Sequence, residues 1–297
     1  MNINGSVAVV TGGGSGIGRA IAIALASEGA DLVIADVNDD YMDEVSGEIE
    51  GLGRKILAVN TDVSKYDSVQ ALFEKSVSEF GRVDIMVNNA GVHMAGPIEK
   101  VTMDDWKWII DINLYGVIHG VQAFLPHFIE RGSGYFVNTA SIAGQAGFLD
   151  PSIPYSVTKF GVVGLSEGLA VAVRDKGVGV TVICPSLVQT NIASAQRNVQ
   201  TDAAAEAMRV RVWELLAEKD WSEILPDAQI LMPEDVGSQV IQAIKEDRFL
   251  VATHDDARDL IMERATDIEG MIRRRAEARA EAEQRFSELS NQAQSES

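Results

Sequence analysis

The sequence predicts an α/β domain built around a doubly wound parallel sheet. Short runs rich in β-branched residues alternate with helical patterns over most of the 297 residues, which is typical of a parallel sheet covered by helices on both faces. A glycine-rich stretch joins the first of these runs directly to the first helical pattern. The chain is 46% hydrophobic, which is sufficient for a large buried core.

Seven strands and the helices between them account for the chain up to about residue 253. The strands are expected at residues 6–10, 31–35, 55–59, 84–87, 135–139, 178–184 and 249–253. Helical patterns lie at residues 19–27, 67–80, 104–129 and 233–245, and another helix begins near Tyr155. Polar residues that follow the strands therefore gather at one edge of the sheet, where ligands bind in such folds.

Composition excludes several kinds of protein. The net charge of −19 argues against a nucleic-acid partner, because no basic surface is available to neutralise phosphates. The single cysteine, Cys184, excludes a disulfide within the chain. The start of the sequence does not have the pattern of a secretory signal, and no apolar run reaches membrane-spanning length. We expect a cytoplasmic protein without a membrane span, a nucleic-acid partner or a metal site.

The glycine-rich stretch after the first strand has the spacing Gly12-x-x-x-Gly16-x-Gly18. A strand, a tight turn and a helix in immediate succession bring backbone N–H groups and a helix N-terminus to one point, where a pyrophosphate is stabilised without a lysine. Only glycine lets phosphates approach the backbone so closely. The alternative interpretation of this stretch is a flexible turn.

Asp36 ends the second expected strand, 18 residues after Gly18. An acidic residue about 20 residues beyond a glycine-rich loop is the usual partner of the adenosine ribose. Its carboxylate would repel a 2′-phosphate, and Val37 and Asn38 follow it in place of an arginine. The pattern favours NAD over NADP. The alternative is an aspartate that caps the next helix.

Tyr155 and Lys159 are four residues apart at the start of a helical pattern, so both lie on one helical face. A free tyrosine has a pKa of about 10, and we expect the Lys159 ammonium to lower the pKa of the phenol. Tyr155 would then exchange a proton near neutral pH. The alternatives are a surface pair and a tyrosine that is merely hydrogen-bonded in the core.

Two further polar residues belong to the same expected site. Ser141 follows the fifth strand and thus reaches the same sheet edge as Tyr155. Asn113 lies in the apolar part of the 104–129 helix, where its buried amide needs partners. Capping of backbone groups is the structural explanation for Asn113.

Together these residues resemble the short-chain dehydrogenase/reductase family over about residues 5–253. The motifs that carry the resemblance occur in the family's order: Thr11-Gly12-x-x-x-Gly16-x-Gly18, Asp62-Val63, Asn88-Asn89-Ala90-Gly91, Asn113, Ser141, Tyr155-x-x-x-Lys159 and Pro185 through Thr190. The resemblance implies a Rossmann-like sheet of seven strands in one catalytic domain, residues 1–254, with cofactor and substrate at the same sheet edge.

The resemblance also implies roles for individual residues. Tyr155 resembles the family's general acid/base, Ser141 the residue that hydrogen-bonds the substrate oxygen, and Asn113 the residue that keeps a water in the proton relay. Lys159 resembles the residue that holds the nicotinamide ribose and lowers the tyrosine pKa. The implied cofactor contacts are Gly12, Ser15, Gly16, Ile17, Gly18, Asp36, Asp62, Val63, Asn89, Gly91, Tyr155, Lys159, Pro185, Val188 and Thr190.

Several loop residues are candidates for contact with the substrate. Each has a plain loop position as its alternative. They are His93, Gln145, Phe148, Ser186, Leu187 and Ile192.

The chain departs from the family pattern at two places. Pro185 is followed by Ser186, where many relatives have glycine, so we expect a less free backbone beside the nicotinamide pocket. The gap between Ser141 and Tyr155 is about one residue longer than is common, and it contains Pro151 and Pro154. Both departures leave the catalytic residues in place and change the expected shape of the pocket.

The C-terminal third adds two segments. Residues 191–225 correspond to the family's helical substrate lid, in which Trp213 and Trp221 either line a pocket or simply pack. Residues 255–297 form an extension that begins with a helical stretch at 255–286 and ends in a polar tail. This extension either packs on a partner subunit or on the lid, or it remains a solvated helix with frayed ends.

The resemblance leads to a specific functional expectation. We expect an NAD-dependent enzyme that interconverts a secondary alcohol and a ketone on a hydrophobic, aromatic or cyclic small molecule, in a homodimer or homotetramer. A faint similarity to bacterial Cα-dehydrogenases of lignin-type aryl ethers lies around residues 96–100 and 191–193. The rival hypothesis is a non-catalytic nucleotide sensor or scaffold that retains the fold.

Overall fold

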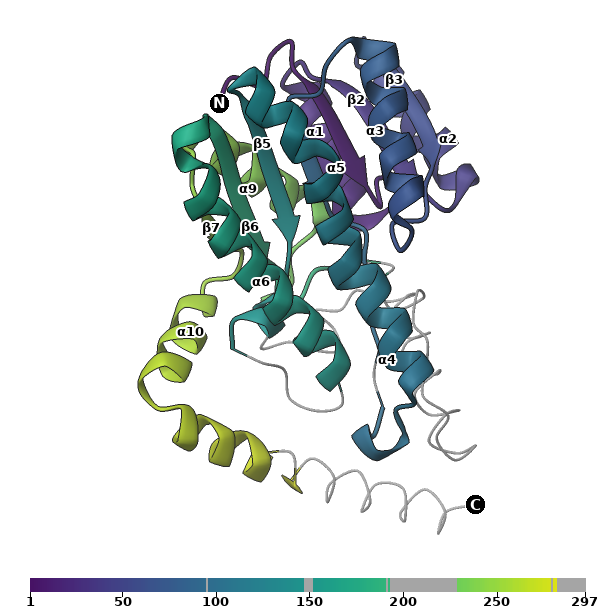
Figure 1. Ribbon diagram of the computed structural model, residues 1–297. Helices are drawn as coiled ribbons and strands as arrows, with labels where there is room; N and C mark the ends of the chain where they lie inside the picture. Colours follow the sequence, from purple (N-terminus) through teal and green to yellow (C-terminus); the bar gives the residue numbers. More distant parts are fainter. Residues whose placement is uncertain (95, 147–151, 191, 193–228, 279, 282–297) are drawn as a thin grey trace.

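Seven parallel strands form one sheet in the order β3-β2-β1-β4-β5-β6-β7 (Figure 1). The structure is a computed structural model that describes residues 1–94, 96–146, 152–190, 192, 229–278 and 280–281. The predicted doubly wound α/β class is confirmed. The strands are β1 (Val7–Thr11), β2 (Asp31–Asp36), β3 (Ile56–Asn60), β4 (Ile85–Asn88), β5 (Gly134–Thr139), β6 (Val178–Cys184) and β7 (Leu250–Ala252).

Helices cover both faces of the sheet. The first face carries α1 (Gly16–Ser27), α2 (Asp39–Gly51) and α9 (Pro233–Glu246). The second carries α3 (Tyr66–Phe80), α5 (Gly116–Arg131) and α6 (Ile153–Val173). The remaining helical elements are η1 (Ile98–Lys100), α4 (Met103–Ile110), η2 (Asp111–Tyr115), η3 (Ile142–Gly144), η4 (Arg174–Lys176) and α10 (Ala257–Thr266).

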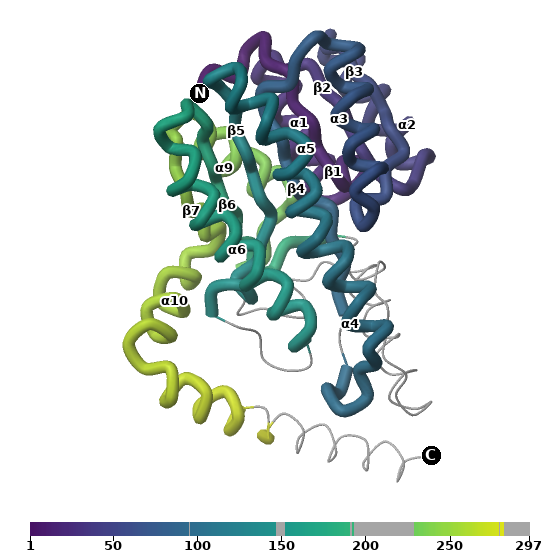
Figure 2. The backbone as a smooth tube through the Cα atoms, in the orientation of Figure 1, coloured from purple at the N-terminus to yellow at the C-terminus, as the bar shows by residue number. Residues whose placement is uncertain are grey.

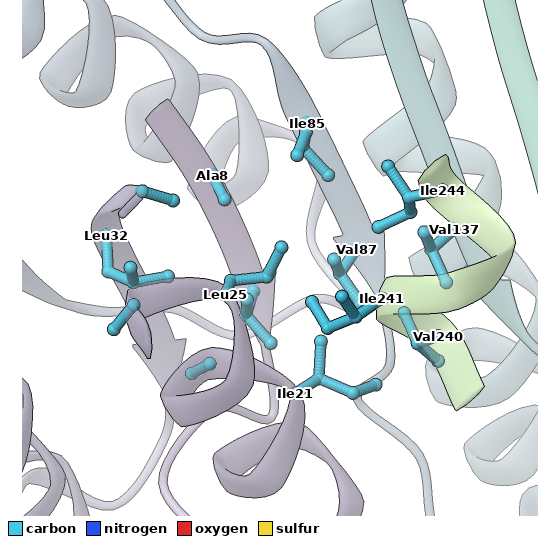
Figure 3. Packing of buried hydrophobic residues seen from close by; sticks show 14 of the residues in the cluster. Ala8, Ile21, Leu25, Leu32, Ile85, Val87, Val137, Val240, Ile241 and Ile244 are labelled. Carbon is cyan, nitrogen blue, oxygen red and sulfur yellow. The ribbon is translucent and has the colours of Figure 1, made fainter. Parts of the chain in front are cut away.

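The central strands are buried on both faces, which explains why their sequences read as continuous apolar runs. Successive side chains alternate: Ala8 and Val10 of β1 face α1 and α9, whereas Val9 faces the α3 and α5 side. Figure 3 shows the first of these cores, in which Ile21 of α1 lies close to Ile241 of α9. The two separate cores lock the register of the sheet, because a slip of one residue would exchange every side chain between them.

The order of the strands places a functional edge between β1 and β4. After β1 the chain builds β2 and β3 on one side, and it then crosses back to add β4 on the other side. The loops that leave the carboxyl ends of β1 and β4 therefore diverge at this point. Such a switch point is the usual ligand site of an open α/β sheet.

The helix expected at residues 104–129 is interrupted in the structure. Residues Met103–Ile110 are α-helical, Asp111–Tyr115 form a single π-helical turn, and Gly116–Arg131 continue as α5. Asn113 lies in the π turn and is fully buried. A π turn is a common way to re-aim a functional side chain within a helix.

The C-terminal extension is also interrupted, where a single helical stretch was expected at 255–286. Helix α10 ends at Thr266, and the chain becomes helical again at residues 268–278. Arg274 pairs with Glu263 and Asp267 across this break at 2.6 and 3.1 Å. Figures 1 and 2 show α10 and the helical residues 268–278 on the side of the sheet's carboxyl edge, away from the N-terminus.

Two helical stretches, Met103–Arg131 and Ile153–Lys176, are long and apolar enough to cross a membrane by length and composition alone. This is weak evidence for a span, because core helices of soluble proteins meet the same criterion. Apolar side chains of α5 and α6, including Phe124, Phe128 and Leu169, pack into the core on the second face of the sheet.

Close packing of α5 on β4 makes Gly120 essential for stability. A Cβ atom at Gly120 would lie 1.9 Å from Asn88 Oδ1, so Gly120→Ala should lower the free energy of unfolding by about 1–3 kcal/mol through overpacking. Gly164→Ala in α6 is the matched control, since its added Cβ meets no atom within 4 Å. Alanine there should leave stability unchanged or raise it by up to about 1 kcal/mol. Chemical denaturation of both variants measures the difference, and equal stabilities would contradict the packing argument.

Candidate active site

The glycine-rich loop folds tightly against the loop that follows β4. Gly12 has φ 63°, and a Cβ atom there would lie 2.9 Å from Ala90 Cα. At Gly18 an added Cβ would lie 2.0 Å from the carbonyl oxygen of Gly12. Ser15 occupies the N-cap position of α1 but makes no side-chain cap bond, and the first turn of α1 contains no acidic residue. This helix terminus therefore suits an anionic group.

Asp36 faces the glycine-rich loop. Its carboxylate accepts hydrogen bonds from the backbone N–H groups of Gly14 at 3.2 Å, Val37 at 2.8 Å and Asn38 at 3.2 Å. The residue that caps α2 is Asn38, whose side chain accepts a bond from Tyr41 N. Asp36 is thus not the helix cap that the alternative interpretation required, and its carboxylate lies at the carboxyl end of β2 beside the loop.

Asn89 connects the ends of β1 and β5. Its Nδ2 donates to the carbonyl oxygens of Thr11 at 3.1 Å and Gly12 at 3.4 Å, and its Oδ1 accepts from Thr139 Oγ1 at 3.2 Å. Thr11 Oγ1 in turn accepts the backbone N–H groups of Asn89 and Ala90. These bonds hold the predicted phosphate loop at a fixed distance from the end of β5.

The pair Asp62-Val63 lies beyond the end of β3. Asp62 is paired with Lys65 at 2.9 Å and accepts a bond from Ser64 Oγ at 2.6 Å. Burial acts to raise the pKa of Asp62, but the bonds from Ser64 and Lys65 outweigh it and lower the pKa. Val63 is buried, and a Cβ atom at Gly116 would lie only 2.9 Å from its side chain.

Asn113 holds the backbone of the loop after β4. Its Oδ1 accepts from Val92 N and its Nδ2 donates to Val92 O, both at 2.8 Å, and Nδ2 also lies 3.3 Å from Thr158 Oγ1. The buried amide is thus satisfied by the backbone capping that the structural explanation proposed. The water-relay role implied by the resemblance remains a prediction.

Ser141, Tyr155 and Lys159 are all buried at the carboxyl edge of the sheet. Lys159 Nζ donates to the carbonyl oxygen of Thr139 at 2.9 Å and lies 5.5 Å from the centre of the Tyr155 ring. Ser141 Oγ donates to Pro185 O at 3.3 Å and accepts from Ala143 N at 3.2 Å. The fold thus brings together the three residues that the sequence singled out from two separate segments.

Gly91 lies against the same group. A Cβ atom at this position would be 3.3 Å from Asn113 Oδ1 and 3.6 Å from Lys159 Nζ. A side chain at position 91 would therefore be in contact with both Asn113 and the Lys159 ammonium. Gly91 lies two residues after Asn89, which contacts the glycine-rich loop.

The expected lowering of the Tyr155 pKa is wrong for this structure. Burial raises the pKa of Tyr155 to about 12, and a hydrogen bond with Ser141 opposes the rise only in part. Burial also lowers the pKa of Lys159 to about 8. Desolvation is the largest cause of the Tyr155 shift, and the Lys159 ammonium donates to Thr139 O rather than to the phenol.

His93 is enclosed by Ser152 and Tyr155. Its Nε2 lies 3.0 Å from Ser152 Oγ, and its ring centre lies 4.9 Å from that of Tyr155. Burial lowers the pKa of His93 to about 4, so the imidazole is neutral near pH 7. A direct contact with substrate remains a prediction for His93.

The other predicted substrate contacts differ in position. Gln145 Nε2 lies 3.7 Å from the buried Cys184 Sγ, next to the end of β6. Ile192 N donates to Thr190 Oγ1 at 3.4 Å. Phe148 and nearly all of the predicted lid at 191–225 lie outside the described residues.

The loop that follows β6 returns to the glycine-rich loop. Pro185 O accepts the N–H of Ile142 at 2.8 Å, and Val188 is buried and bridged to Leu231. A Cβ atom at Gly16 would lie 3.4 Å from Thr190. Ser186 is not among the described residues with positive φ, so serine is accommodated without the backbone strain that would favour glycine.

Sequence reasoning missed two residues that organise this edge. Thr139 supplies the carbonyl that holds Lys159 and the hydroxyl that bonds Asn89. His254, directly beyond β7, contacts the backbone at Ser186 and Leu187. Thr139 is the last residue of β5 and His254 lies two residues beyond β7, and this position at the carboxyl end of a strand was the available signal.

Comparison with known proteins agrees with the geometry. A family model described as short chain dehydrogenase matches residues 6–201. The 3beta-hydroxysteroid dehydrogenase 2 of Eggerthella lenta is 36% identical over 205 residues, covering 68% of this chain and 78% of that protein. The (2S)-[(R)-hydroxy(phenyl)methyl]succinyl-CoA dehydrogenase subunit BbsD of Thauera aromatica is 31% identical over 256 residues, covering 84% and 94%.

A solved structure agrees over more of the chain. The crystal structure of a short chain dehydrogenase/reductase from Burkholderia phymatum in complex with NAD has a TM-score of 0.80 and 33% identity, and the match covers 91% of this chain and 96% of that one. The chain therefore belongs to the short-chain dehydrogenase family, and the predicted family is confirmed. It is an oxidoreductase that acts on CH–OH groups.

The neutral, partly buried His93 predicts a dependence of stability on pH. Its pKa is about 4 in the folded protein and about 6.5 in an unfolded chain, so the unfolded state takes up a proton first as the pH falls. The resulting stability is complete above pH 6.5 and is lost between about pH 6.5 and 4, by about 3 kcal/mol in total. His93→Phe should show a smaller loss over this range in denaturation at several pH values. If the free energy of unfolding of the wild type and of His93→Phe fell equally with pH, the prediction would be contradicted.

Proposed function

We propose that the protein interconverts a secondary alcohol and a ketone with NAD as the hydride carrier, through proton transfer at Tyr155. The observation that carries this proposal is the common burial of Ser141, Tyr155 and Lys159 at the carboxyl edge of the sheet, beside Gly91. A binding protein would have no need to hold a phenol and an ammonium together in a site of low polarity, where both have shifted pKa values.

The described residues fit a dinucleotide at this edge. The open α1 terminus, with glycines whose Cβ atoms would collide with the backbone, would receive the pyrophosphate. Asp36 would bind the adenosine ribose, and no basic residue stands at positions 37 and 38 to pair with a 2′-phosphate. We therefore assign NAD, in agreement with the relative from Burkholderia phymatum that contains it.

Tyr155, Ser141 and Lys159 have different tasks in the proposed reaction. Bound NAD would accept a hydride from the carbinol carbon, or NADH would donate one to the carbonyl carbon, and the positive charge of the oxidised ring would favour the phenolate. Tyr155 Oη takes the hydroxyl proton during oxidation and returns it during reduction. Ser141 Oγ, which donates to Pro185 O in the structure, would turn its proton to the same substrate oxygen and stabilise the developing charge there. Lys159 supplies positive charge beside the phenol and would bond the ribose.

Apolar side chains around Tyr155 favour a hydrophobic substrate. Met94, Ile109 and Ala143 form a buried cluster with Tyr155, and Trp108 packs against it. His93 adds a neutral ring. A cyclic or aromatic alcohol fits this wall, and the names of the relatives from Eggerthella lenta and Thauera aromatica refer to substrates of that kind.

We also propose that the protein is a cytoplasmic homo-oligomer whose subunits meet through α5, α6 and the turn before α5. Apolar side chains on these elements are exposed in the single chain: Tyr115, Ile129, Val157 and Val171, the last 82% exposed. Patches of this kind are usually covered by a partner. Residues 1–254 would form the catalytic domain, with residues 255–297 as an appended extension.

Removal of the Tyr155 hydroxyl tests the chemistry. Tyr155→Phe should lower kcat by at least about 10²-fold, because general acid/base catalysis is lost, while NADH binding measured by fluorescence is retained. Tyr135→Phe is the matched control: Tyr135 is also buried, with its pKa raised to about 12, but its hydroxyl bonds Thr181 away from the site. Turnover on a panel of secondary alcohols is followed by NADH absorbance. Unchanged turnover in Tyr155→Phe would contradict the acid/base role of Tyr155, whereas absence of turnover in the wild type despite NADH binding would favour the sensor hypothesis.

Removal of the Asp36 carboxylate tests the choice of cofactor. Asp36→Ala should raise KM for NAD by roughly tenfold and reduce the discrimination against NADP, because a charge-assisted bond and a repulsion are both lost. Asp39→Ala, which removes a carboxylate that bonds Asn60 at 2.8 Å instead of facing the glycine loop, is the control. The measurement is kcat/KM with each dinucleotide. A wild-type preference for NADP would overturn the assignment.

A further inference from the structure

His254 lies beyond the last strand of the sheet, wedged against the loop that follows β6. It is 5% exposed although it belongs to the connection between β7 and α10. The neighbouring Thr253 is equally buried, and its backbone N–H faces the carbonyl of Cys184 at 3.5 Å. The imidazole thus occupies the carboxyl edge of the sheet on the β7 side, next to the predicted nicotinamide pocket.

The hydrogen bonds of His254 define its tautomer. Nε2 lies 3.0 Å from the carbonyl oxygen of Leu187, which can only accept, so Nε2 carries a proton. The backbone N–H of Ser186 points at Nδ1 at 3.4 Å, so Nδ1 is the acceptor. Thr253 Oγ1, 2.7 Å from Nδ1, then donates its proton to the same nitrogen and fixes the ring. The imidazole binds two consecutive residues of one loop, one through each nitrogen.

The bonded loop lies between the two halves of the site. One residue before Ser186, the carbonyl of Pro185 accepts bonds from Ser141 Oγ and Ile142 N. Three residues after Leu187, Thr190 lies against Gly16 of the glycine-rich loop. A shift of the backbone at residues 186 and 187 would therefore move both the Pro185 carbonyl, which bonds Ser141, and Thr190, which lies against the glycine-rich loop.

We propose that His254 is a positioning residue that holds the loop at residues 185–188 in the conformation that receives the nicotinamide end of the cofactor and orients Ser141. The inference rests on the proposed function, since it assumes a dinucleotide at this edge. The ladder between β6 and β7 ends at Cys184 and Ala252, before Ser186, and a backbone N–H outside a ladder needs another partner. Ser186 stands where many relatives have glycine, and its bond to His254 orders this loop without a glycine.

The test combines cofactor binding with a measurement on the free protein. His254→Phe keeps a planar ring but removes both bonds, and it should weaken NADH binding in a fluorescence titration by roughly tenfold. Hydrogen exchange of the peptide spanning residues 185–190 should become at least about tenfold faster in the same variant without cofactor. His254→Gln retains a donor and an acceptor and should recover part of both effects.

A matched histidine provides the control. His127 Nε2 accepts the backbone N–H of Val83 at 3.3 Å, but Val83 lies at the opposite end of β4 from the site. His127→Phe should leave NADH binding and exchange of the 185–190 peptide unchanged, even if it lowers stability. Thr253→Val, which removes only the hydroxyl that fixes the ring, provides a milder variant and should weaken NADH binding about threefold.

Equal NADH affinity and equal exchange in the wild type, His254→Phe and Thr253→Val would overturn the positioning role. Weaker binding in His127→Phe of the same size would also overturn it, because general destabilisation would then be the cause. Failure of the wild type to bind NADH would instead overturn the proposed NAD function. The two failures are therefore distinguishable.

Discussion

The parallel register of β1, β4, β5 and β6 is the constraint on which the site depends. Asn88 of β4 pairs with Asn138 of β5, and Thr139 pairs with Ile183 of β6, so these strands end at one level. Buried bonds from Asn88 to Asn138 and from Asn138 to Ser166 tie this level to α6. The helix that carries Tyr155 and Lys159 is thereby held in register with the sheet edge, so the position of these two side chains is set by regular elements.

Desolvation is the second determinant of the site. The same burial raises the pKa of Tyr155 and lowers that of Lys159, so it disfavours charge on both side chains. A charged nicotinamide ring or a polarised substrate oxygen in this space would have a large effect on either group, because attraction is strong where water is excluded.

Local patterns allowed the fold and most of the candidate site to be predicted. Hydrophobic runs identified all seven strands to within about two residues, and the glycine spacing located the turn after β1. Other features depended on distant partners. Asn113 in the π turn bonds the backbone of Val92, and the partly buried ring of His93 packs against Tyr155. Neither contact has a signature in the neighbouring sequence.

The sequence by itself determined the class of fold, the chemical groups available and the end of the sheet to which they belong, because strand and helix periods and the order of residues after each strand are local properties. Only the tertiary structure decided the direction of the Tyr155 pKa shift, the hydrogen-bond partner of Lys159 and the hydrogen bonds of His254 to Ser186 and Leu187. Each of these results depends on how much water remains around a side chain and on which backbone carbonyl lies within reach. Such quantities are set by segments up to 68 residues apart, as between Ser186 and His254.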